Sequence, residues 1–214
     1  MQLKGLTPEN AERVARHLAM VPLLIDGDPE LAHRHAKAAA QRAGRLAVVH
    51  ETLGLTAYRV GDYNLALREL QAHRRMSGSQ DQLPVIVDTE RGLGRPERGL
   101  AVAAEVDRSK LPVGIRINLA VAVSGARLDM GNAEAALREL EIAELTPTRV
   151  FPQSPLLFRS YAECLRELGR LDEAARWEQL GDEAEVAIAN PVEETIELIE
   201  ELELPVERKP RRTE

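Results

Sequence analysis

The segment VGDYNLALRELQAH, residues 60–73, is repeated in outline at four other places in the chain. Each copy has a glycine near its start, a small residue five positions later, and then apolar residues at helical spacing. The related segments begin at residues 26, 93, 130 and 168, and successive glycines are 34, 33, 37 and 38 residues apart. This recurrence indicates an array of similar structural units. The glycines are Gly27, Gly61, Gly94, Gly131 and Gly169, and the small residues are Ala32, Ala66, Gly99, Ala136 and Ala174.

The repeated glycine is typical of a turn between two helices. Glycine has no β-carbon, so it adopts the left-handed conformation just past a helix at low cost. Asp28, Asp62 and Asn132 directly follow three of these glycines and are favourable N-caps for a second helix. Pro29 and Pro96 suit the first turn of a helix. Each unit is therefore predicted to be two antiparallel helices, which must stack on their neighbours to bury an apolar face.

The second unit resembles the tetratricopeptide repeat. The residues that carry the resemblance are Leu53, Gly54, Gly61, Asp62, Tyr63, Ala66 and Leu70, which lie at the relative positions usual in that family. The resemblance covers about residues 8–189, although the other units keep fewer signature residues. More narrowly, the chain resembles actinobacterial proteins of this repeat type. The resemblance implies an all-α, right-handed solenoid of about five helix-turn-helix repeats.

The repeat spacing divides the chain into one helical domain and a tail. The repeat domain is expected at 8–189, with units at about residues 13–46, 47–80, 80–113, 117–150 and 155–188. Residues 190–204 start with Asn190 as a possible N-cap and place apolar residues at helical spacing among glutamates, which predicts an acidic amphipathic helix. That helix either caps the last repeat or binds a partner in trans. Residues 205–214 are expected to be disordered.

The segment LPVIVDTERGLGRPERGL, residues 83–100, has the appearance of a strand followed by a phosphate-binding loop. A dinucleotide loop needs a glycine three positions after Gly94, where this chain has Glu97. A P-loop needs a lysine and a hydroxyl residue directly after Gly99, and this chain has neither. The repeat pattern instead predicts that residues 85–87 belong to a helix.

Composition restricts the class of partner. The 214 residues carry a formal net charge of -7, which disfavours general binding to nucleic acid or to an anionic membrane. No apolar run approaches the roughly 18 residues needed to span a bilayer, and residues 1–20 lack an apolar signal-peptide core. We therefore expect a cytoplasmic protein with no nucleic-acid or membrane partner. The oligomeric state is not indicated by the sequence.

The sequence contains no recognisable catalytic or metal-binding motif. Its histidines form no H-x-x-x-H or H-E-x-x-H pair, which predicts structural roles for His17, His33, His35, His50 and His73. Cys164 is the single cysteine, so an intrachain disulfide and a cysteine-based metal cluster are both excluded. It lies at an apolar helical position, which predicts a buried thiol. No enzyme activity, cofactor or metal is expected.

The family resemblance implies that the first helix of each repeat lines a concave groove. The groove positions, carried across unit by unit, predict the partner-binding residues Tyr58, Arg59, Asp88, Arg91, Leu128, Arg159 and Arg166. In this interpretation Tyr58 and Leu128 supply apolar contacts, and the arginines bind acidic groups in bidentate fashion. Alternatively, the arginines pair with carboxylates on neighbouring helices, for which Asp88, Asp129 and Glu163 are candidates.

Two functions follow from these residues. The leading hypothesis is a non-enzymatic scaffold or adaptor that binds a partner peptide or helix in the groove. The alternative is a regulatory or sensor subunit that binds a small anionic ligand through convergent groove arginines.

Overall fold

The computed structural model describes residues 5–190, and within this range the chain is all-helical. No described residue lies in a strand, and residues 85–87 lie inside a helix, as the repeat pattern predicted. A 3-10 turn, Arg108–Lys110, precedes the seventh helix. The α-helices are α1 (Pro8–Leu24), α2 (Pro29–Ala43), α3 (Ala47–Arg59), α4 (Tyr63–Ser77), α5 (Leu83–Gly92), α6 (Pro96–Ala104), α7 (Val113–Asp129), α8 (Ala133–Leu140), α9 (Ser154–Glu167) and α10 (Leu171–Ala189).

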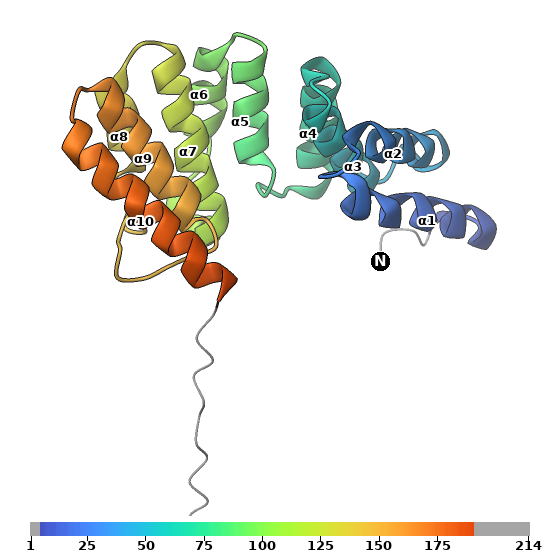
Figure 1. The fold of residues 1–214 in the computed structure, drawn as a ribbon. Helices are drawn as coiled ribbons and strands as arrows, with labels where there is room; N and C mark the ends of the chain where they lie inside the picture. The colour runs from blue at the N-terminus through green and yellow to red at the C-terminus, as the bar shows by residue number, and fades with distance from the viewer. Residues whose placement is uncertain (1–4, 191–214) are drawn as a thin grey trace, which may run out of the picture.

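The helices pack in the order of the chain, each against the next one (Figure 1). In addition, each odd-numbered helix from α1 to α7 contacts the following odd-numbered helix. Helices α1–α4 lie at one end of the molecule and α5–α10 at the other (Figure 1). The surface shared by α3, α5, α7 and α9 is called the odd-helix face below.

The predicted helix starts are confirmed. The side chains of Asp28, Asp62 and Asn132 each accept a hydrogen bond from the backbone N–H three residues later, at 2.9, 3.1 and 3.0 Å. Pro29 and Pro96 are the first residues of α2 and α6. The caps satisfy backbone donors that have no partner within the helix.

The predicted left-handed turns are confirmed at four of the five repeat glycines. Gly61, Gly94, Gly131 and Gly169 have φ values of 79°, 70°, 72° and 74°. In each turn the residue after the glycine donates its backbone N–H to the carbonyl five residues earlier, for example Asp62 to Ala57 at 2.9 Å. This pairing is the Schellman arrangement, which requires a left-handed residue and therefore favours glycine.

The prediction is wrong for Gly27, whose φ lies outside the left-handed region. Here Asp28 donates its N–H to the carbonyl of Leu24, four residues earlier, at 2.7 Å. The first turn therefore closes one residue more tightly than the other four and does not need a left-handed residue. Gly78, which is not a repeat glycine, has a positive φ of 72° at the end of α4.

The predicted small positions lie at close contacts between helices. Ala32, Ala66 and Ala136 are fully buried, and Ala174 is nearly so. At Gly99 an added β-carbon would lie 3.1 Å from the backbone oxygen of Val87 on α5. Such a distance is shorter than ordinary van der Waals contact, so a larger residue here would push α6 away from α5.

The apolar core is divided along the chain. Two core clusters lie among α1–α4 and their flanking residues. A third is formed by α5, α6 and α7, and the largest by α7 to α10. All four are built almost entirely from alanine, leucine, valine and isoleucine, with Phe158 as the one buried aromatic residue among them.

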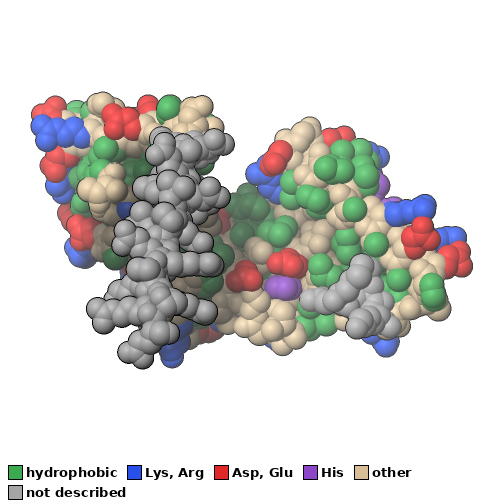
Figure 2. All heavy atoms as spheres, turned by 90° about the horizontal axis from the view of Figure 1, so that it is seen from below, with side chains coloured by type: hydrophobic (Ala, Val, Ile, Leu, Met, Phe, Trp, Pro, Cys, Tyr) green, Lys and Arg blue, Asp and Glu red, His purple; other side chains and the backbone are tan. Residues whose placement is uncertain are grey.

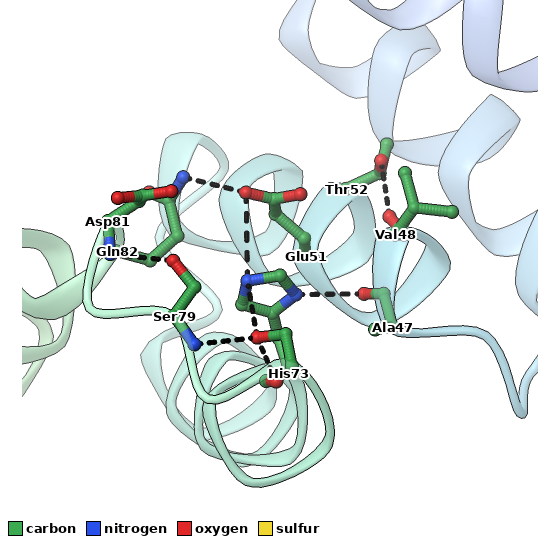
Figure 3. A network of polar contacts seen from close by, with 9 residues as sticks. Ala47, Val48, Glu51, Thr52, His73, Ser79, Asp81 and Gln82 are labelled. Carbon is green, nitrogen blue, oxygen red and sulfur yellow. Dashed lines mark hydrogen bonds and ion pairs between the residues drawn. The ribbon is translucent and has the colours of Figure 1, made fainter. Parts of the chain in front are cut away.

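Polar contacts cross the boundary between these two groups of helices. Gln82, just before α5, donates a hydrogen bond to Glu51 on α3 at 2.9 Å. The same network includes His73, whose Nδ1 donates to the backbone oxygen of Ala47 at 3.0 Å (Figure 3). In Figure 2, acidic side chains and a histidine lie together near the middle of the molecule. Directional hydrogen bonds therefore help to set the position of α5 relative to α3.

The chain beyond the last helix is only partly covered by the structure. Asn190, predicted as an N-cap, is the C-cap residue of α10, and its side chain donates to Val186 at 3.2 Å. The rest of the predicted acidic helix at 190–204, and all of 205–214, lie outside the described residues. Among the helices that are described, none is long and apolar enough to cross a membrane.

The contrast between Gly131 and Gly27 yields a stability test. A β-carbon at either position meets no atom within 4 Å, so packing does not distinguish them. Gly131→Ala places alanine in a left-handed conformation and should lower the free energy of unfolding by about 1–2 kcal/mol. Gly27→Ala lacks this strain and should be neutral, or stabilising by a few tenths of a kcal/mol. Urea unfolding of the two variants measures the difference, and equal effects would contradict the assignment of the turns.

Candidate functional site

Four polar side chains from three helices form a continuous chain of hydrogen bonds on the odd-helix face. Tyr58 on α3 donates its hydroxyl to Asp88 on α5. Arg91, one turn further along α5, donates from Nη1 to Asp88 at 2.6 Å. Arg91 also donates to Asp129 at the end of α7, from Nε at 2.8 Å and from Nη2 at 3.2 Å. We call these four residues the polar ladder.

Glycine makes room for the polar ladder. An added β-carbon on Gly125 of α7 would lie 2.4 Å from the guanidinium carbon of Arg91, so Arg91 lies directly against the α7 backbone. On the other side, a β-carbon on Gly92 would lie 2.8 Å from the ring of Tyr63, which in turn packs against Tyr58 with ring centroids 5.9 Å apart. The bidentate contact between Arg91 and Asp129 thus depends on the absence of a side chain at Gly125 of α7.

The electrostatics of the polar ladder hold its groups in defined protonation states. Burial, together with the hydrogen bond to Asp88, raises the pKa of Tyr58 above its ordinary value, so the hydroxyl stays protonated and donates. Burial acts to lower the pKa of Arg91, but its hydrogen bond to Asp129 and the nearby charge of Asp88 outweigh that effect and raise it. Arg91 is therefore a permanent cation between two carboxylates.

Two pockets adjoin Arg91. The larger, of about 570 Å³, lies at the ends of α5 and α7 and is lined by Arg91, Gly94, Pro96, Glu97, Asp129 and Met130. The smaller, of about 150 Å³, lies between α5, α7 and α9 and is lined by Arg91, Val121, Ser124, Gly125, Leu128, Asp129, Ser160 and Glu163. We call the smaller one the α7–α9 pocket. The predicted contact residue Leu128 lines it.

The remaining predicted arginines lie in separate ion pairs. Arg59 donates to Asp26 at 2.6 Å, and Arg166 donates to Glu178 at 3.3 Å. Arg159 donates to Asp182 at 2.8 Å and also to Glu185 on α10. The structure thus brings Tyr58, Asp88, Arg91 and Leu128 together but places the other three arginines with carboxylates elsewhere. All four arginines are paired, and Arg91 is held by two of the anticipated carboxylates, Asp88 and Asp129. The third candidate, Glu163, forms no ion pair with an arginine among the described residues, so that part of the alternative is wrong.

A histidine pair on α1 and α2 was not apparent in the sequence. His17 and His35 meet with their Nδ1 atoms 2.9 Å apart and their ring centroids 5.1 Å apart. They are 18 residues apart in the chain, so only the packing of the two helices brings them together. Burial, with the nearby charges of His35 and Arg42, lowers the pKa of His17. The described residues contain no group of three or more potential metal ligands, and this pair has no third ligand.

Two other predictions about single residues can be compared with the structure. His33 and His73 are buried and hydrogen-bonded, His33 to Thr56 at 3.0 Å, which agrees with structural roles. Cys164 is fully buried, with Ser124 Oγ at 3.4 Å from its sulfur. Burial raises the pKa of this thiol and so disfavours the reactive thiolate.

Comparison with known proteins adds no functional assignment to this geometry. No protein-family model matches the chain, and no curated protein matches it. The functional argument therefore rests on the polar ladder and on the pockets beside it.

Removal of the Tyr58 hydroxyl tests the polar ladder. Tyr58→Phe should lower the free energy of unfolding by roughly 1 kcal/mol, because it leaves one oxygen of Asp88 without its donor. Tyr63→Phe is the matched control, since within the described residues the Tyr63 hydroxyl makes no hydrogen bond. In an Asp88→Ala background the effect of Tyr58→Phe should shrink, as a double-mutant cycle by urea unfolding would measure. An unchanged effect would show that the two side chains are not coupled.

The histidine pair predicts a loss of stability in acid. One Nδ1 must donate and the other must accept, so the contact is lost once both rings carry two protons. The pKa of His17 is lower in the folded state than the ordinary 6.5. The contribution of His17 to the free energy of unfolding is therefore fully present above about pH 6.5 and is lost as the pH falls below that value. Wild-type unfolding free energy should drop by roughly 1 kcal/mol more than that of His17→Leu between about pH 7.5 and about pH 5.5. Equal drops would contradict this assignment.

Proposed function

We propose that this protein is a non-enzymatic scaffold or adaptor, and that its helices form a right-handed solenoid of tetratricopeptide type. The consecutive packing of helical hairpins supports the proposal, as do the four left-handed glycine turns at regular intervals along the chain. The family resemblance implies that the first helix of each hairpin faces the partner. Those helices are α1, α3, α5, α7 and α9.

The observation that carries the proposal is the polar ladder on the odd-helix face. Three helices that are distant in sequence place Tyr58, Asp88, Arg91 and Asp129 in one hydrogen-bonded row, and two pockets adjoin it. A rigid row of polar groups with neighbouring pockets suits an extended segment, which uses backbone contacts for affinity and side chains for specificity. A helical segment would instead place side chains from one of its faces into the pockets. The partner is thus a protein segment bound across α3, α5, α7 and α9.

The sensor alternative has less support. It requires the groove arginines to converge on one anion, whereas Arg59, Arg159 and Arg166 are each paired with different carboxylates. The α7–α9 pocket, at about 150 Å³, is also below the roughly 300–1,000 Å³ typical of small-molecule sites. The larger pocket, at about 570 Å³, is within that range, but Arg91 is the one predicted groove arginine among its lining residues. A protein segment, which can span both pockets, fits this arrangement better.

Site-specific photo-crosslinking tests the proposal. Benzoylphenylalanine at Met130, which lines the larger pocket and is 44% exposed, should crosslink a specific protein in the cells that produce this chain. The matched control is the same replacement at Met76 on α4, which is 50% exposed and lines neither pocket at Arg91. Mass spectrometry of the products identifies the partner. Crosslinking of the same proteins at both positions, or at neither, would contradict binding on the odd-helix face.

A further inference from the structure

We propose that the α7–α9 pocket receives a lysine or arginine side chain of the bound segment. This inference rests on the proposed function and specifies the chemistry of the partner. The arginine-rich groove positions suggested a partner with acidic groups, whereas this inference assigns the partner a basic group.

The net charge around the pocket is negative. Of the residues that line it, Asp129 and Glu163 each carry one negative charge and Arg91 carries one positive charge, which leaves a sum of -1. Asp88, which does not line the pocket, adds a further negative charge next to Arg91. Three N–H groups of Arg91 are already used in hydrogen bonds to Asp88 and Asp129. An incoming carboxylate would thus approach a neutralised guanidinium and three carboxylates, whereas a cation is attracted.

Glu163 is the residue that remains available to a partner. It lies on α9, lines the pocket and is exposed. Across the described residues it forms no hydrogen bond and no ion pair, unlike Asp88 and Asp129. A partner's ammonium or guanidinium can therefore bind Glu163 without first breaking a contact within the chain.

The walls of the pocket suit the aliphatic part of the same side chain. Val121 and Leu128 are partly buried, pack against the core of α7–α10 and line the pocket. Between them the guanidinium of Arg91 lies against Gly125, and Ser160 on α9 adds a hydroxyl that accepts hydrogen bonds. Lysine and arginine bury their methylene stems against apolar surface while the charged end stays with polar groups. The small volume, about 150 Å³, matches one side chain rather than a whole ligand.

Selection of random peptides on the immobilised full-length chain tests the inference. Peptides displayed on phage should be enriched for lysine or arginine at one fixed position. Replacement of that residue by glutamine in a synthetic peptide should weaken binding by about tenfold or more, the usual range for a charged hydrogen bond. Glu163→Gln should weaken the original peptide by a similar factor. The matched control, Glu167→Gln, removes the same charge one turn further along α9, where it does not line the pocket, and should leave the affinity unchanged.

The outcomes separate this inference from the proposed function. The basic-residue assignment is overturned if the enriched peptides carry no basic residue at a fixed position. It is also overturned if they bind Glu163→Gln as tightly as wild type. Either result leaves the scaffold proposal standing. Peptides that depend on an acidic residue instead would restore the role first expected for Arg91. If no peptide is enriched and crosslinking at Met130 also fails, both proposals are wrong. Because Glu163 forms no hydrogen bond and no ion pair within the described residues, the variant should unfold at the same urea concentration as wild type.

Discussion

The close approach of neighbouring helices at small residues is the constraint on which the rest of the structure depends. An added β-carbon at Gly54 would lie 2.7 Å from Leu70, and one at Gly99 would lie 3.1 Å from the backbone of Val87. Aromatic residues make up only 3% of the chain, so the core is filled mainly with short aliphatic side chains that pack well only when helices are close. The same closeness places Arg91 against Gly125 and allows one hydrogen-bonded row to join α3, α5 and α7.

The hydrogen bonds in this row give Arg91 a structural role, in place of the partner-binding role that the sequence suggested. An isolated arginine on a binding surface favours acidic groups, but Arg91 is enclosed by Asp88 and Asp129. Its charge is neutralised within the fold, where it links α5 to α7, while the hydrogen bond from Tyr58 to Asp88 links α3 to α5. The sign of the surface is then set by the carboxylates that remain, among them Glu163, which is exposed and lines the α7–α9 pocket.

Much of the fold was predictable because it depends on local chemistry. Helix caps, prolines at helix starts and glycines after helices act within a few residues, so Asp62, Pro96 and Gly131 indicated their own conformations. The failure at Gly27 shows the limit of this reasoning. Its turn closes with a hydrogen bond to Leu24 rather than across five residues, and the sequence around the glycine does not distinguish the two closures.

The repeat pattern alone was sufficient to establish that the chain is helical, where most of its turns lie and which small residues are buried, since each of these depends on neighbours in sequence. The pairing of side chains from different helices was not accessible in the same way. Tyr58 and Asp88 are 30 residues apart, Arg91 and Asp129 are 38 apart, and His17 and His35 are 18 apart. Whether an arginine meets a partner or a neighbouring carboxylate depends on how adjacent helices are offset and on a glycine at the point of contact. Those are properties of the packed molecule, and they decide the charge that the odd-helix face presents.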